Sequence, residues 1–160
     1  MGYKESFSGL GPAELLGFVK SEARDALGGE GNAWIRLVDV AAAGMRRSPR
    51  AEDRALYAEA AFGALDGMRA SSAVPDGRWA VMAVKVRVDR TLLSDRSGPE
   101  RNLDASAAYD IVLGQTNAVG SHAPDIRRMA SQLARVQEYL TAEQRRTVRA
   151  WADPDPGIQA

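Results

Sequence analysis

The sequence contains no cysteine, a single histidine (His122) and only 6% aromatic residues. The absence of cysteine excludes disulfide bonds, thiolate metal sites and cysteine nucleophiles. A zinc site would have to combine this one histidine with carboxylates alone, which is not the usual ligand set of that metal. The shortage of aromatic residues predicts a core built mainly from alanine, valine and leucine, and we expect neither a metal nor a cofactor.

Long hydrophobic runs are also missing. No segment approaches the roughly 18 consecutive apolar residues that indicate a membrane-spanning helix. The first eleven residues lack the basic start and the apolar stretch of a signal peptide. We therefore expect a soluble, cytoplasmic protein that has no membrane partner.

Neither sign of charge dominates, since 21 basic side chains balance 21 acidic ones. No global field therefore attracts nucleic acid or a membrane surface. Eighteen of the basic residues are arginine, a bias that, with the abundant alanine, is typical of a GC-rich bacterial genome such as that of an actinobacterium. Locally the balance differs, because residues 126–149 hold six arginines and two glutamates, whereas residues 100–125 hold one arginine and four acidic residues. This asymmetry allows a charged interaction face.

The length of 160 residues fits one domain with a single hydrophobic core. We predict an N-terminal arm over residues 1–11, a helical domain over 12–152 and a C-terminal tail over 153–160. The tail is predicted because the sequence DPDPG cannot continue a helix.

Apolar residues recur at helical spacing along most of the chain. The pattern predicts seven helices, which begin near residues 12, 32, 48, 78, 104, 126 and 141. Pro12 suits the first position of a helix, and Thr141 with Gln144 has the pattern of a capping box. The other residues predicted to cap helix N-termini are Asn32, Ser48, Asp104 and Asp125.

The fourth predicted helix has a competing interpretation. Residues 79–89 alternate apolar and polar side chains, as a half-buried strand does, but Trp79, Met82 and Val86 also share one helical face. A lone strand needs a partner, and no other segment favours a strand. The expected fold class is therefore all-α, one compact domain of six or seven helices packed as antiparallel hairpins, with an α+β fold as the alternative.

Glycine and proline mark two further features. Gly63 and Gly67 lie one helical turn apart on the apolar side of the third predicted helix, where each costs about 1 kcal/mol relative to alanine. Close packing against a neighbouring helix would compensate for this cost. The polar segment 94–102, which contains Gly98-Pro99, is predicted to be a loop.

Two short segments of the sequence resemble each other. VPDGR at residues 74–78 and APDIR at residues 123–127 share an apolar-Pro-Asp-x-Arg pattern 49 residues apart. The pattern fits either a duplicated helical hairpin or a common way of starting a helix, used twice.

No group of residues has the pattern of a catalytic or phosphate-binding site. His122 stands in a predicted turn between Gly120-Ser121 and Ala123-Pro124, without a partner to orient it as a base. The glycine-rich segment 28–34 lacks the lysine and hydroxyl residue of a P-loop. The expectation is a protein that is not an enzyme.

Arginine supplies the remaining signal, because arginine is enriched at protein interfaces. The predicted function is a non-catalytic protein-interaction module (a regulator, adaptor or immunity-type inhibitor) that binds a partner through an arginine-bearing helical face. The alternative is a helical regulator that binds DNA or RNA through arginine clusters at 46–54 and 127–149. The sequence also leaves a homo-oligomer open. The predicted partner-binding residues are Arg127, Arg128, Arg135, Arg145, Arg146 and Arg149.

Overall fold

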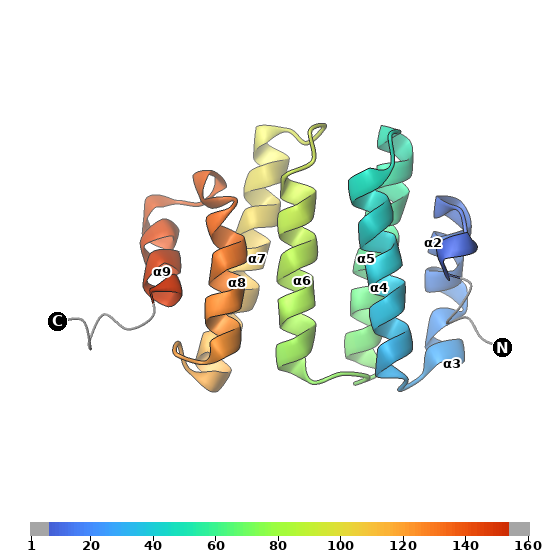
Figure 1. The fold of residues 1–160 in the computed structure, drawn as a ribbon, viewed down its shortest axis with the longest axis horizontal. Coiled ribbons are helices and arrows are strands. Elements are labelled where there is room, and N and C mark those ends of the chain that lie inside the picture. The colour runs from blue at the N-terminus through green and yellow to red at the C-terminus, as the bar shows by residue number, and fades with distance from the viewer. Residues whose placement is uncertain (1–6, 154–160) are drawn as a thin grey trace. The chain divides into compact units, whose positions relative to one another are not determined.

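The computed structural model describes residues 7–153, and over this range the chain is helical with no strand. The elements, shown in Figure 1, are η1 (Phe7–Gly9), α2 (Pro12–Ser21), α3 (Ala23–Leu27), α4 (Gly31–Arg47), α5 (Ala51–Ala70), α6 (Asp76–Thr91), α7 (Gly98–Val119), α8 (Pro124–Ala134), η2 (Gln137–Tyr139) and α9 (Ala142–Ala152). The all-α prediction is confirmed, and the strand alternative for 79–89 is wrong because these residues lie within α6. None of the helices in this range is long and apolar enough to span a membrane.

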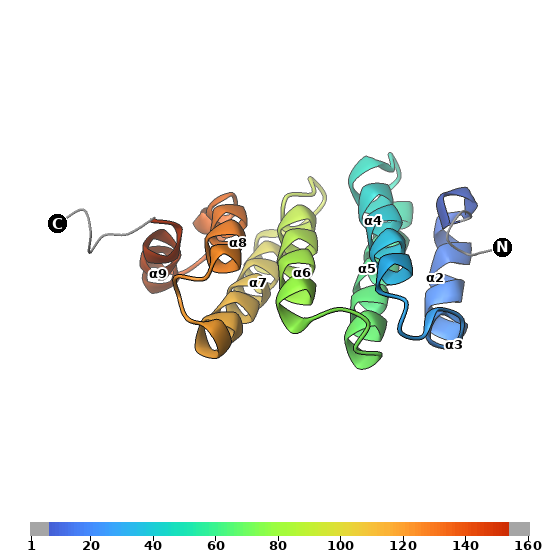
Figure 2. The same cartoon turned by 60° about the horizontal axis from the view of Figure 1, so that its bottom comes forward.

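The chain divides into two compact units, a first unit Met1–Trp79 and a second unit Ala80–Ala160. In the first unit α4 and α5 form an antiparallel hairpin and α2 packs against α5, as both ribbon views show (Figures 1 and 2). In the second unit α8 contacts both α7 and α9. The predicted pairing of helices as antiparallel hairpins is thus confirmed.

Close helix packing in the first unit explains two of its glycines, Gly63 and Gly67. A Cβ atom built on Gly67 would lie 2.5 Å from the Trp34 ring of α4, and one built on Gly63 would lie 2.8 Å from Val19 of α2. The compensation predicted for these two glycines is therefore present. Phe7, within the predicted N-terminal arm, is buried with its ring centroid 5.6 Å from that of Phe18.

The core of the second unit joins α7, α8 and α9. The rings of Tyr109 on α7 and Trp151 on α9 stack with their centroids 5.3 Å apart. Ile126, Met129 and Leu133 are fully buried along one side of α8, as their spacing of three and four residues predicts. This packing leaves the opposite sides of α8 and α9 exposed.

Some helix starts were predicted correctly. Pro12 begins α2, and the Thr141 hydroxyl accepts a hydrogen bond from the Gln144 amide at 3.1 Å while the Gln144 side chain accepts one from the Thr141 amide at 3.0 Å. Both capping contacts satisfy backbone amides that the first helical turn leaves without partners.

The predicted start of α7 is wrong. The helix begins at Gly98, because Ser97 and Glu100 form a capping box and Pro99 occupies the first turn, where its missing amide costs nothing. Most of the predicted loop 94–102 is therefore helix. Asp104 is not a cap but a buried residue in the second turn of α7.

Other predicted boundaries also differ from the structure. The first predicted helix is divided at Glu22 into α2 and α3, and α4 begins one residue before Asn32, which therefore does not cap it. Ser48 lies outside α5, where its carbonyl oxygen accepts a hydrogen bond from Arg54 at 2.9 Å. Asp125 stands in the first turn of α8 rather than at its N-cap.

The sixth predicted helix is shorter than its periodicity indicates. α8 ends at Ala134, and the apolar spacing continues through η2 although the α-helix does not. Val136 and Leu140 are still buried. Apolar spacing alone therefore did not distinguish the helix from the turn that follows it.

Candidate functional site

Three of the predicted partner-binding residues share one side of α9. At about 100° of rotation per residue, Arg145, Arg146 and Arg149 project within roughly 100° of arc, opposite the buried side that carries Val148 and Trp151. Glu143 is the only acidic residue of this helix. We call Arg145, Arg146 and Arg149 the α9 arginine face.

The α9 arginine face makes few contacts within the chain. Arg145 donates a hydrogen bond to the Leu140 carbonyl oxygen at 2.7 Å, which fixes the arginine beside the start of the helix. Arg146 and Arg149 are exposed, and neither forms an ion pair with another residue in the range 7–153. Two guanidinium groups on one helical turn are therefore available to an external acceptor.

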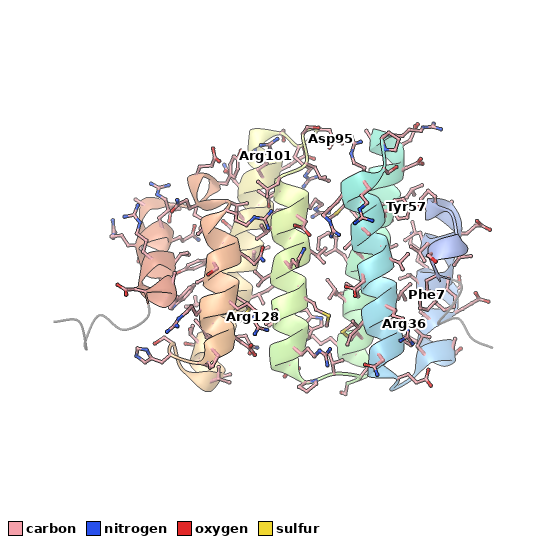
Figure 3. The ribbon with its side chains drawn as sticks, in the orientation of Figure 1. Phe7, Arg36, Tyr57, Asp95, Arg101 and Arg128 are labelled. Carbon is pink, nitrogen blue, oxygen red and sulfur yellow. The ribbon has the colours of Figure 1, made fainter. Side chains whose placement is uncertain are left out.

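The arginines of α8, and Arg135 just after its end, have different surroundings. Arg128 lies 3.8 Å from Asp125 one turn earlier and is labelled on α8 in Figure 3. Arg135 donates a hydrogen bond to Gln132 at 2.8 Å and lies 3.8 Å from the buried Asp89 of α6. Arg127 is exposed and points about 100° of rotation away from Arg128. Five of the six predicted residues thus lie on α8 or α9, and Arg135 directly follows α8. The arginines of α9 make the fewest contacts within the chain.

The arginine cluster at 46–54 belongs to the first unit. Arg50 pairs with Glu52, and Arg54 is held by the Ser48 carbonyl oxygen. The Arg54 hydrogen bond connects the first turn of α5 to the turn between α4 and α5, whereas Arg50 pairs with a residue of that same first turn. The guanidinium groups of Arg50 and Arg54 therefore already have acceptors within the chain.

The chain matches no family model, no curated protein and no solved structure. Its function has to be inferred from the chemistry of its own side chains.

A buried carboxylate in the second unit was not predicted as a functional residue. Asp104 of α7 accepts four hydrogen bonds from three arginines. Arg90 donates two of them, at 2.9 and 2.6 Å, while Arg87 and Arg96 donate one each at 3.1 and 2.8 Å. The Asp104 side chain is only 2% exposed, whereas the three arginines are 20–31% exposed. We call these four residues the Asp104 cluster.

Arg101 extends the polar contacts beyond the Asp104 cluster, at the end of α7 that Figure 3 shows near the α6–α7 turn. Its guanidinium donates to the carbonyl oxygens of Leu93 and Arg96 and to the Tyr139 hydroxyl at 2.7 Å. These bonds tie the α6–α7 turn to η2. Because the acceptors lie within the chain, the Asp104 cluster and Arg101 hold the second unit together and do not form an open binding site.

The sequence carried only a weak signal for this cluster. Arg87 and Arg90 are one helical turn apart, so they share a side of α6, but their common acceptor follows 14 to 17 residues later on another helix. Because residues 94–102 were predicted to be a loop, Asp104 was placed at the start of the helix and not in its second turn. A capping box recognised at Ser97 and Glu100 would have placed it there.

Burial opposes the ionisation of Asp104, but the hydrogen bonds and positive charges of Arg90, Arg96 and Arg87 outweigh it. They hold the pKa of Asp104 below its ordinary 3.8. A folded-state pKa below the unfolded one stabilises the fold above the unfolded pKa, and this contribution disappears as pH falls through the folded value.

We therefore expect an Asp104→Asn variant to differ most from the wild type at neutral pH. The difference between their free energies of unfolding should narrow as pH falls below about 4. Urea unfolding of both proteins at a series of pH values measures it. A difference that stays constant down to pH 2 would contradict the assigned role of the carboxylate.

Two further features were candidates for a site, one in each unit. His122 is exposed in the turn between α7 and α8, as predicted. A concavity of about 240 Å³ lies at the junction of α2 and α3, and its lining residues are Val19, Lys20, Ser21, Glu22, Arg24 and Asp25. Within the described residues, no group of histidine and acidic side chains could hold a metal ion.

Proposed function

We propose that this protein is a protein-interaction module that binds its partner through the α9 arginine face. The observation that supports the proposal is the pair of exposed guanidinium groups of Arg146 and Arg149, which have no ion-pair partner in the described range. Guanidinium groups recognise carboxylates through paired hydrogen bonds, so the partner presents acidic side chains.

The geometry of the second unit favours a protein over a nucleic acid as partner. α8 and α9 are joined by residues 135–141, a longer connection than the three or four residues of a helix-turn-helix. Arg128 of α8 and Arg135, which directly follows α8, each lie near an aspartate of the chain. Few guanidinium groups therefore remain for a run of phosphates, and a protein surface with two or three carboxylates matches the face better.

The test is a comparison of the proteins captured by three immobilised variants from a lysate of the source organism. The wild type is compared with R145E/R146E/R149E and with R24E/R46E/R47E, which reverses the same number of exposed arginines in the first unit. We expect a protein that the wild type and the control retain and the α9 variant loses. The captured protein must then bind directly when purified.

Two results would contradict the proposal. One is that all three variants capture the same proteins. The other is that the α9-dependent ligand is DNA or RNA, seen as a gel shift whose affinity falls steeply as salt concentration rises. Circular dichroism of the α9 variant must first show an unchanged helix content.

A further inference from the structure

The outer side of α7 carries large apolar side chains that the chain does not cover. Leu103 is 72% exposed and Leu113 is 40% exposed. Gly114, close to Leu113 on this side, differs from Gly63 and Gly67 because a Cβ atom built on it would meet nothing within 4 Å. An exposed leucine costs free energy in water, so a second surface that covers Leu103 would be stabilised.

The charge on this side of α7 is negative. Asp110 is exposed and forms no ion pair with another described residue. Asp110 follows Leu103 by seven positions, so the two side chains project within about 20° of each other on the helix. Glu100 also lies on this side, although its carboxylate is already engaged by Ser97 and Arg96. No exposed basic side chain lies between Leu103 and Asp110. We call Leu103 and Asp110, with Leu113, the α7 outer face.

The α9 arginine face has the complementary pattern in the same spacing. Ala142 and Arg149 are both exposed and also lie seven residues apart, within about 20° of each other. If α7 of one copy runs parallel to α9 of another, Leu103 lies opposite Ala142 while Asp110 lies opposite Arg149. A large apolar residue then faces a small one, and an acid faces a base. The antiparallel alignment would instead set Leu103 against Arg149 and leave Asp110 against Ala142.

A contact between two α7 outer faces is less favourable. In such a two-fold arrangement, pairing Leu103 with Gly114 would bring the Asp110 side chains of the two copies near each other at the centre. Like charges facing each other across an interface are destabilising. The charges of these side chains therefore favour contact between the two different faces.

We propose that the α7 outer face of one copy binds the α9 arginine face of a second copy, with Asp110 opposite Arg149. This inference rests on the proposed function and identifies its partner as a second copy of this chain. Because the two faces differ, each copy has one of each, and association continues into rings or chains instead of stopping at a two-fold dimer.

Exchanging the charges of Asp110 and Arg149 tests the inference. Sedimentation of the full chain over a range of concentrations is expected to show an average mass that rises above the monomer and falls again as salt is added. D110R and R149D should each weaken association about tenfold or more. The double variant D110R/R149D should recover it, because the charges are exchanged and not removed. R24D, which reverses an exposed charge in the first unit, is the control and should associate like the wild type.

Mixing the two single variants gives a second readout. D110R keeps an intact α9 arginine face and R149D keeps an intact α7 outer face, so an equimolar mixture should associate where neither does alone. A wild-type protein that stays monomeric up to about 100 µM would overturn the inference, because this concentration is far above a micromolar dissociation constant. So would association that neither single variant changes. If the chain is monomeric while its α9 arginine face captures a different protein, the self-association inference fails and the proposed function stands.

Discussion

Replacement of Asp104 by asparagine is expected to lower the free energy of unfolding by about 3 kcal/mol. The change removes the negative charge at the centre of the Asp104 cluster and replaces one of its two accepting oxygens by an NH2 group, while Arg87, Arg90 and Arg96 stay close together. Breaking a buried ion pair from one side typically costs about 3–5 kcal/mol, and the partial exposure of the three arginines places this case at the lower end.

Urea unfolding followed by circular dichroism measures the loss. Glu138→Gln is the matched control, because Glu138 is an exposed carboxylate in the same unit and its neutralisation should change stability by less than about 0.5 kcal/mol. An Asp104→Asn protein as stable as the control would show that the Asp104 cluster contributes nothing to the fold.

Replacement of Gly67 by alanine should destabilise the protein by about 2 kcal/mol, although alanine is the better helix former. The new methyl group would lie 2.5 Å from the Trp34 ring. Trp34 has no room to withdraw, since it is fully buried and its Nε1 donates a hydrogen bond to the Gly28 carbonyl oxygen at 2.8 Å. The substitution therefore forces α4 and α5 apart.

Gly17→Ala is the control for this prediction. Gly17 lies in α2 of the same unit, and a Cβ atom there would meet nothing within 4 Å. This variant should gain about 0.5–1 kcal/mol from its helix propensity alone. Thermal unfolding of both variants gives opposite shifts if the packing account is correct, and equal shifts would contradict it.

The periodicity of the sequence was enough to predict the fold class and the buried side of several helices. Ile126, Met129 and Leu133 are buried as predicted, and Gly63 with Gly67 faces neighbouring helices. Both observations follow from local spacing, because the 3.6-residue turn of a helix determines the side on which each residue projects. The boundaries were less accurate, since Gly98-Pro99 reads as a loop unless the capping box that contains it is recognised.

The contacts of individual arginines could not be predicted in the same way. From the sequence, all six arginines were predicted to bind the partner. In the structure, however, Arg135 lies near Asp89, 46 residues earlier, and Arg128 lies near Asp125. The acceptor of Arg87, Arg90 and Arg96 is likewise on another helix from two of them. Pairs of this kind depend on how helices are packed and not on local spacing. The α9 arginine face was predictable because all three of its residues lie on one helix.

The affinity of the purified partner for the wild type and for R145E/R146E/R149E tests the central claim most directly. Isothermal titration calorimetry at physiological salt measures both. We predict that the three reversals weaken binding about a hundredfold or more, since each sets like charges against each other at the contact. Dissociation constants that agree within a factor of about two, the spread expected for a surface charge outside the contact, would contradict binding through the α9 arginine face.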